Sequence, residues 1–233
     1  MHQNVKNTGS GAVNIAVFTD NFLALSETFI YRQAVGVLPE FSPVVICSRV
    51  KNREVFPYSL LEVIPQANFA ERMIRKIRTI LNGGFFIPVP RLQKFCENVL
   101  QKYECRLIHA HYCTNAIKIM HIAKKLSIPL VFSVHGFDIT TFQHIKSFKE
   151  NLQLLFQLSS KAIATSDDFK NLLVSLGCPS EKITRHYIGV PVEDYRQKKY
   201  TTLGNKTIIC LQVSNFVEKK GHVYTIRAFK KCN

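Results

Sequence analysis

The chain has 233 residues, of which 46% are hydrophobic and 20% charged, a composition typical of a globular protein with a core. It has no apolar run near the roughly 20 residues of a membrane-spanning helix, and its polar N-terminus lacks a signal peptide's apolar stretch, so we expect a cytoplasmic protein. The formal charge of +15 indicates an anionic partner, either nucleic acid, an acidic membrane surface or phosphorylated small molecules.

Apolar runs typical of strands alternate with helical patterns along the chain. The expected strands span 13–18, 43–48, 60–64, 106–111, 129–134, 161–166 and 207–213. The expected helices span 26–38, 69–81, 114–126, 144–158 and 167–177, with a last one from about residue 221. Ser26 is the candidate N-cap of the first of these, and Gly177 is a plausible helix stop. Continuous apolar strands separated by helices predict an α/β fold, with a parallel sheet covered by helices on both faces.

A polar stretch separates the last strand and helix from the elements before them. We therefore expect a first domain over 13–192, a linker over 193–206 and a further unit over 207–233. The last unit has about 30 residues, which are too few to bury a core alone. It is either an addition to the first sheet or the start of a second domain.

The segment 69–106 departs from the alternation of strand and helix. In its first part Ala70, Met73, Ile74, Ile77 and Leu81 recur at helical spacing, and arginine or lysine takes up most of the other positions. Such a basic amphipathic helix fits an anionic membrane surface. The alternative, which is the commoner outcome for a charge run, is a helix packed on the sheet with its basic side in solvent.

Polar side chains lie where several of the expected strands end. They are Thr19 and Asp20 after the first strand, His109 and His111 in the fourth, His135 and Asp138 after the fifth, and Ser166 after the sixth. Ligands of open α/β sheets bind at the carboxyl ends of the strands. The convergence of these side chains on one edge predicts a ligand site there.

The histidines allow more than one interpretation. His109 and His111 share one face of a strand and would form a metal site with His135 or Asp138 as a third ligand, but packing beneath a helix is commoner, and we expect no metal. His135 precedes Gly136, which permits a sharp turn. This imidazole either bonds a sugar hydroxyl or carbonyl, acts as a base, or belongs to a turn with Asp138 as its partner.

The stretch VSNFVEKKGH (213–222) contains a polar loop with two lysines and a glycine at the start of a helix. Helix-start amides with a lysine nearby form an anion site suited to a diphosphate. The chain has neither the G-x-G-x-x-G pattern nor a Walker loop, so dinucleotide and P-loop sites are not indicated.

Five stretches, in order along the chain, resemble the retaining glycosyltransferases of family 4. They are SETFIYRQ (26–33), LIHAHY (107–112), HGFDI (135–139), SLGCPSEKITRHYIGV (175–190) and VEKKGH (217–222). The set is most similar to enzymes of bacterial exopolysaccharide and colanic acid synthesis. The resemblance implies the N-terminal half of a GT-B fold, which is a Rossmann-like parallel sheet, followed by the first βα unit of a second Rossmann domain.

The resemblance also implies roles for individual residues. His135 would be the catalytic residue that reaches the donor sugar near its anomeric carbon. The residues expected at the donor phosphates are Lys220, Gly221 and Asn215. The residues expected around the acceptor and the cleft are Ser26, Glu27, His111, Asp138 and Ser166. The donor would be a nucleotide-sugar, no cofactor or metal would be required, and the acceptor would be a saccharide or a polyprenyl-diphosphate-linked saccharide.

Two departures from the family pattern matter. Ser214 and Asn215 stand where the family usually has Gly-Arg, so a neutral amide replaces a fork-shaped cation. The chain also ends at Asn233, before the family's glutamate pair and nucleobase contacts. We therefore expect a truncated glycosyltransferase of polysaccharide synthesis that has little activity unless a second fragment completes it. The alternative is a carbohydrate or lipid-phosphate binding module.

The cysteines and the absence of a nucleic-acid-binding motif limit the partners that we expect for the chain. Seven cysteines without a CxxC pair argue against a disulfide framework and a thiolate zinc site. Nucleic acid is not an expected partner, because charge alone favours it and no binding motif is recognisable. The expected partners are the nucleotide-sugar, the acceptor and an anionic membrane surface bound through 69–106 on the inner face of the membrane.

Overall fold

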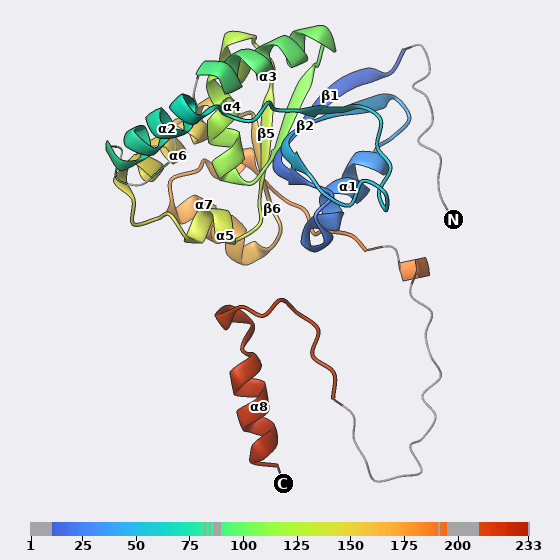
Figure 1. The fold of residues 1–233 in the computed structure, drawn as a ribbon, viewed down its shortest axis with the longest axis vertical. Helices are drawn as coiled ribbons and strands as arrows, with labels where there is room; N and C mark the ends of the chain where they lie inside the picture. The colour runs from blue at the N-terminus through green and yellow to red at the C-terminus, as the bar shows by residue number, and fades with distance from the viewer. Residues whose placement is uncertain are drawn as a thin grey trace. The chain divides into compact units, whose positions relative to one another are not determined.

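The computed structural model of the chain describes residues 11–81, 83, 85, 90–190, 192–194 and 210–232. The chain divides after Val190 into two units, and each is described by itself. The first unit is a parallel sheet with helices packed on it, and the described part of the second contains one α-helix (Figure 1).

The described residues of the first unit form one seven-stranded sheet. Its strands are β1 (Val13–Phe22), β2 (Phe41–Val50), β3 (Leu61–Val63), β4 (Leu107–His111), β5 (Leu130–Val134), β6 (Lys161–Ala164) and β7 (Ile183–Arg185). Their order is β3-β2-β1-β4-β5-β6-β7, and every neighbouring pair is parallel. The expected Rossmann-like parallel sheet is confirmed.

Helices cover both faces of the sheet unequally. The α-helices described in the first unit are α1 (Thr28–Val35), α2 (Phe69–Leu81), α3 (Pro90–Lys102), α4 (Cys113–Lys125), α5 (Phe137–Thr140), α6 (Lys146–Leu158) and α7 (Asp167–Ser175). Buried side chains of α3, α4, α6 and α7 join the main core on one face. On the other face α1 packs over β1 and β2 in a smaller core.

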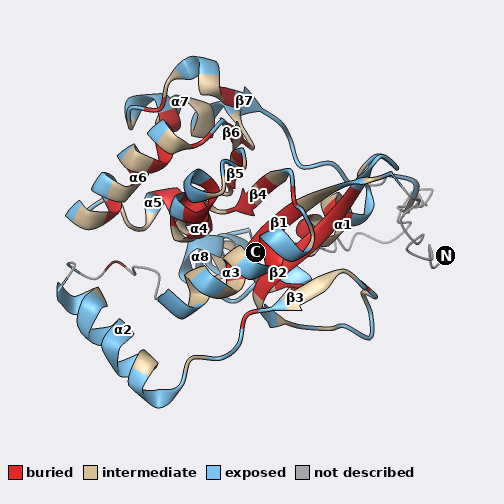
Figure 2. Ribbon diagram, turned by 90° about the horizontal axis from the view of Figure 1, so that it is seen from above, coloured by how far each residue is buried: buried red, intermediate tan, exposed pale blue. Residues whose placement is uncertain are grey.

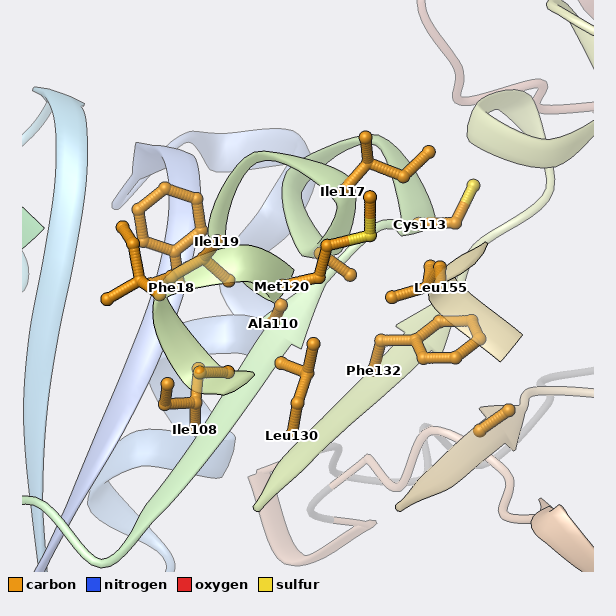
Figure 3. Close-up of a cluster of buried hydrophobic side chains, with 14 of the residues drawn as sticks. Phe18, Ile108, Ala110, Cys113, Ile117, Ile119, Met120, Leu130, Phe132 and Leu155 are labelled. Atoms are coloured by element: carbon orange, nitrogen blue, oxygen red, sulfur yellow. The ribbon is translucent and has the colours of Figure 1, made fainter. Parts of the chain in front are cut away.

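The main core follows from the alternation of side chains along the strands. Ile108 and Ala110 of β4 and Leu130 and Phe132 of β5 point to one face, where Met120 of α4 packs against them (Figure 3). All five are buried, and burial of each large side chain contributes about 1.5–3 kcal/mol. The alternate residues of β4, His109 and His111, therefore lie on the opposite face. This alternation explains why an apolar strand carries two histidines.

Several expected boundaries need correction. Ser26 does not cap a helix, because it lies exposed in a 3-10 turn, Leu25–Glu27, and α1 begins at Thr28 without a side-chain cap. The first strand continues to Phe22, so Thr19 and Asp20 lie inside it rather than after it. Gly177, with a φ of 91°, follows the end of α7 as expected.

The second unit matches its predicted elements in part. Residues 207–209 of the expected strand lie outside the described residues, and 210–213 are not in a strand. A 3-10 turn, Glu218–Lys220, is followed by α8 (His222–Lys230). The helix therefore begins directly after Gly221, as expected.

The helix α2 does not pack as the commoner alternative predicted. None of its residues is buried, and its large apolar side chains are among the exposed ones. The expectation of an apolar side packed on the sheet is therefore wrong.

The described residues also bear on thiols and membrane spans. All seven cysteines are free, and five of them are buried. No helix in the described part of the chain combines the length and hydrophobicity of a membrane span.

Candidate functional site

The order of the sheet reverses between β1 and β4, because β2 and β3 follow on one side and β5, β6 and β7 on the other. Ligands of open α/β sheets bind at the carboxyl ends of the strands beside such a switch point. A cavity of about 820 Å³ lies there. Its lining comes from the ends of β1 and β2, from α4 and α5, and from α2. A smaller cavity of about 430 Å³ is lined by connections at the opposite edge, such as Arg106 and Pro129.

The cavity lining combines charges with aromatic rings. Its cations are Arg49, Arg75 and Lys118. Its carboxyl groups are Asp20, Glu27 and Asp138. Its aromatic residues are Phe85, Tyr112, Phe137 and Phe142. Carboxyl groups bind saccharide hydroxyls, cations bind phosphate oxygens, and rings bind apolar surface, so the lining suits a polar or anionic ligand with an apolar part.

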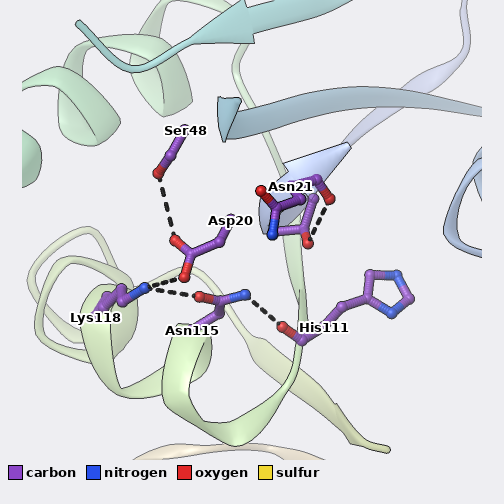
Figure 4. A network of polar contacts seen from close by, with 7 residues as sticks. Asp20, Asn21, Ser48, His111, Asn115 and Lys118 are labelled. Carbon is purple, nitrogen blue, oxygen red and sulfur yellow. Dashed lines mark hydrogen bonds and ion pairs between the residues drawn. The ribbon is translucent and has the colours of Figure 1, made fainter. Parts of the chain in front are cut away.

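A polar network ties the two central strands to α4 across the switch point (Figure 4). The ammonium group of Lys118 donates to Asp20 and, over 3.0 Å, to Asn115 Oδ1. Ser48 Oγ donates to Asp20 Oδ1 over 3.3 Å, and Asn115 Nδ2 donates to the carbonyl of His111 over 2.9 Å. The Lys118 side chain is only 13% exposed, so its charge faces Asp20 in a partly desolvated setting. The network holds a cation and a carboxylate at the cavity wall.

Tyr112 links the cavity to the histidines. It has a φ of 74°, which is unusual for an aromatic residue, at the junction between β4 and α4. Its hydroxyl bonds to Glu27, and burial raises the pKa values of both groups. The second carboxyl oxygen of Glu27 is buried without a hydrogen-bond partner among the described residues. Strained residues and unpaired buried oxygens cluster at functional sites, so this pair marks the wall between cavity and histidines.

Three histidines lie beside that wall on the same face of the sheet. His135 Nε2 is 3.3 Å from His111 Nδ1, and the two rings are stacked 5.5 Å apart. The His135 ring also contacts Phe29 and Tyr112, with centroids 4.7 Å and 4.8 Å away. His109 is bonded to Ser133 Oγ over 2.8 Å.

The histidine cluster is neutral near pH 7. Burial lowers the pKa of His109 and of His135 to about 4, and each further positive charge would repel the others. Burial also lowers the pKa of His111, which is 1% exposed. Nδ1 of His135 is buried and has no hydrogen-bond partner among the described residues. A neutral imidazole with an unused ring nitrogen suits a hydrogen bond to a substrate.

Asp138 is bonded to the backbone rather than to the ring of His135. One carboxyl oxygen accepts from the Cys113 amide over 2.7 Å, and the other from the His135 amide over 3.1 Å. Burial raises its pKa despite these bonds. The turn that permits them includes Gly136, whose φ is 100° and where a Cβ atom would lie 2.7 Å from Phe169 Cζ. Asp138 therefore fixes the exit of β5 against the start of α4.

The described residues do not support the metal site that the histidine pair suggested. They contain no group of three or more His, Cys, Asp or Glu side chains arranged to hold a metal ion. Asp138 uses both carboxyl oxygens on backbone amides, and His109 is bonded to Ser133, so neither is oriented as a ligand.

The structure brings some of the expected site residues together. Glu27 and Asp138 line the cavity, and His111 and His135 lie next to it behind Tyr112. Ser166 instead caps α7, where its hydroxyl accepts from the Phe169 amide over 3.2 Å.

The residues expected at the donor phosphates lie in the second unit. Gly221 has a φ of 70° and directly precedes α8, as an anion site at a helix start requires. Lys220 is exposed, and its carbonyl accepts from Gln212 over 3.0 Å. The carbonyl of Asn215 contacts His222 Nε2 at 3.1 Å.

Tyr112, Asn115 and Lys118 are among the residues of this site that sequence reasoning missed. A signal for Lys118 exists, because it interrupts the apolar positions of α4 between the buried Ile117 and Ile119. No comparable signal distinguishes Tyr112, whose unusual backbone appears only in the folded chain.

Comparison with known proteins adds a family to this geometry. The family model described as Glycosyltransferase Family 4 matches residues 41–194. The colanic acid biosynthesis glycosyltransferase WcaL of Salmonella typhimurium is 26% identical over 144 residues, which cover 60% of this chain and 35% of that protein. The amylovoran biosynthesis glycosyltransferase AmsK of Erwinia amylovora is 27% identical over 122 residues, which cover 52% of this chain and 30% of that protein. The chain thus spans about a third of the length of these relatives.

Solved structures share the fold at low identity. HepE of Anabaena in complex with UDP-glucose superposes with a TM-score of 0.56 at 15% identity, covering 80% of this chain and 46% of that one. The UDP-GlcNAc 2-epimerase of Neisseria meningitidis bound to UDP-GlcNAc superposes with a TM-score of 0.50 at 16% identity, covering 73% of this chain and 44% of that one. At such low identity these structures show the shared fold and not a shared activity.

Proposed function

Because the chain belongs to Glycosyltransferase Family 4, whose model matches residues 41–194, we propose that it serves in sugar transfer. The reaction is transfer from a nucleotide-sugar to a saccharide or polyprenyl-diphosphate-linked acceptor, with retention at the anomeric carbon. The names of the two curated relatives support a role in exopolysaccharide synthesis. The single observation that carries the proposal is the cavity at the switch point of the sheet, with a neutral histidine cluster behind its wall.

The acceptor binds in the cavity at the carboxyl edge. Asp20 and Glu27 bond its hydroxyl groups, while Arg49 and Lys118 neutralise a phosphate, as the mixed charge of the lining supports. The neighbouring aromatic side chains accept the apolar part of a lipid-linked acceptor. Ser26, which directly precedes the lining residue Glu27, borders this site.

His135 is the residue proposed to act on the donor sugar. Its lowered pKa keeps the imidazole neutral, and Nδ1 has no bond to another described residue. It donates or accepts one hydrogen bond at the reacting sugar, and His111 fixes the ring from the other nitrogen. Such a preorganised bond is worth about 100-fold or more in rate when it is made in the transition state.

The donor phosphates bind at the start of α8. Lys220 and the amides that follow Gly221 carry the positive potential that a diphosphate requires, with Asn215 in the same loop. These groups stabilise the departing nucleoside diphosphate without a cofactor or a metal. We propose domains over 13–192 and from 207, joined by a linker over 193–206, and the division after Val190 supports this arrangement.

The proposed location is the cytoplasm, at the inner face of the membrane, where nucleotide-sugars and lipid-linked acceptors meet. The alternative, a binding module without transfer, predicts acceptor binding but no turnover. The same cavity serves both proposals, so turnover distinguishes them.

The test is a transfer assay with a panel of nucleotide-sugars and lipid-linked saccharides. It uses the 233-residue chain alone and after addition of the C-terminal domain of the colanic acid relative. We expect transfer with the added domain and its loss in His135→Ala. Absence of transfer in every combination, or transfer unaffected by His135→Ala, would contradict the proposal. Turnover by the chain alone would show that the added domain is not needed for transfer.

A further inference from the structure

The helix α2 turns its polar side toward the protein. Glu71 and Thr79 are partly buried, whereas the other residues of α2 are exposed. Thr79 and Arg75 line the cavity. Glu71 also forms an ion pair with Arg91 of α3 over 3.2 Å and accepts from the Asn68 amide over 3.0 Å. These contacts of α2 with the rest of the first unit are made by polar side chains.

The apolar side of α2 faces outward. Its large side chains are exposed to 75% at Phe69, 44% at Met73, 48% at Ile74, 52% at Ile77, 66% at Ile80 and 78% at Leu81. At about 100° per residue these positions fall within an arc of about 140° on one side of the helix. Figure 2 shows α2 at the periphery of the first unit, coloured as exposed along most of its length. This arrangement is the reverse of an ordinary surface helix, whose apolar stripe packs on the core.

Cations lie along both borders of the apolar arc. In the helical projection Lys76 and Arg72 follow one border, next to Phe69, and Arg78 follows the other, next to Ile74. An apolar side flanked by arginine and lysine is the pattern of helices that lie in the interface of anionic membranes. The chain's net charge of +15 adds long-range attraction to such a surface.

We propose that α2 docks on an anionic membrane surface, with its apolar side in the lipid and its polar side lining the cavity. The mouth of the cavity then opens at the height of the lipid headgroups. A lipid-linked acceptor could place its diphosphate among Arg49, Arg75 and Lys118 while its hydrocarbon stays in the bilayer. The acceptor assignment rests on the proposed function, whereas docking itself does not.

Vesicle flotation tests docking directly. The 233-residue chain should float with vesicles of phosphatidylcholine and phosphatidylglycerol, and far less with phosphatidylcholine alone or at high salt. Ile77→Gln with Ile80→Gln should reduce the bound fraction at least about tenfold. Because α2 has no buried residue, these variants should keep the fold, which circular dichroism checks. Val55→Gln with Val174→Gln replaces two exposed apolar side chains outside α2. This matched control should bind normally.

Charge variants measure the electrostatic contribution to vesicle binding. Arg72→Gln with Lys76→Gln should weaken binding to anionic vesicles by roughly 30-fold, at about 1 kcal/mol for each cation. Lys124→Gln with Lys149→Gln removes the same charge from exposed positions of α4 and α6 and should have a much smaller effect. Equal losses from both pairs would mean that charge acts without α2 and would overturn the proposal.

An introduced tryptophan reports on the depth of α2. The chain contains no tryptophan, so Phe69→Trp supplies a single probe on the apolar side. Its emission should shift to shorter wavelength with anionic vesicles, whereas Phe41→Trp, at the opposite edge of the sheet, should not shift. Equal behaviour of the two probes would contradict docking through α2. So would a stable dimer in light scattering that Ile77→Gln with Ile80→Gln dissociates, without any vesicle binding, because a second copy would then cover this side.

The outcomes for docking and for sugar transfer are independent. Flotation requires no donor, so vesicle binding in the absence of transfer by the chain with the added domain would leave docking intact and contradict the proposed function. Transfer to soluble saccharides without vesicle binding would support the proposed function and contradict docking.

Discussion

The rings of His111 and His135 stack 5.5 Å apart, with His111 Nδ1 3.3 Å from His135 Nε2. One histidine comes from the end of β4 and the other directly follows β5, so the parallel register of these strands creates the contact. The two imidazoles share one site only because both are neutral. A proton on either would repel charge on the other and would lose hydration in the buried cluster.

Stability should therefore decrease in mild acid. His109 and His135 have folded-state pKa values of about 4, below the ordinary 6.5, so the unfolded chain binds more protons between these values. Their contribution is complete above pH 6.5 and is lost as the pH falls toward 4. We expect the free energy of unfolding to decrease by roughly 3 kcal/mol through His109 alone. Urea titrations across this range measure it.

His109→Gln should reduce that pH dependence, because glutamine takes up no proton, and the remaining part should come from His135. His121→Gln, at an exposed position of α4, is the control and should leave the profile unchanged. Identical acid profiles for His109→Gln and the parent chain would show that the cluster does not control acid stability.

Asp138 should be a structural anchor. Asp138→Asn places an amide group against one of the two backbone amides that the carboxylate accepts from, so one donor loses its partner. We expect a loss of about 1–3 kcal/mol in the free energy of unfolding by denaturant titration. Asp168→Asn, in the first turn of α7, should cost less than about 1 kcal/mol. Equal costs at the two positions would argue against the anchor.

Gly136 should tolerate no side chain. Gly136→Ala combines a φ of 100° with a Cβ atom 2.7 Å from Phe169 Cζ, and we expect a loss of about 2 kcal/mol. In a Phe169→Leu background the loss should be smaller, because the ring tip is gone while the backbone strain remains. Gly189→Ala, where a Cβ atom meets nothing within 4 Å, should cost little. An unchanged penalty in the Phe169→Leu background would mean that the contact is irrelevant.

Lys118 and Asp20 should be energetically coupled. In a double-mutant cycle of Lys118→Met and Asp20→Asn, we expect a coupling of about 1 kcal/mol, because the Lys118 side chain is only 13% exposed. The pair Lys146–Glu150 is exposed to 92% and 63%, so its cycle should give about 0.5 kcal/mol or less. Additive effects of the two substitutions would show that Lys118 and Asp20 do not interact energetically.

The sheet could be predicted from the sequence because its apolar runs are continuous. Strands such as β5, Leu130–Val134, are largely buried, so they consist mostly of apolar residues. This local pattern predicts a parallel sheet without any knowledge of tertiary contacts. The edge that carries the site was also predictable, since polar residues follow those runs. The partners of these residues were not. Asp138 bonds the amide of Cys113, which is 25 positions away, and no local pattern encodes that contact.

The orientation of α2 illustrates the same limit. Periodicity shows that Met73, Ile74 and Ile77 share a side, but not whether that side faces the protein or the surroundings. Only the packing of Thr79 and Glu71 against the first unit decides this. The commoner arrangement was therefore the wrong expectation for this helix.

We propose that the histidine cluster beside the cavity acts in sugar transfer. The most direct measurement compares transfer rates of the parent chain and His135→Ala, each supplied with the C-terminal domain of the colanic acid relative. We expect a decrease of about 100-fold or more, with the fold of the variant retained in circular dichroism. Equal rates for the two proteins, at equal stability, would contradict it.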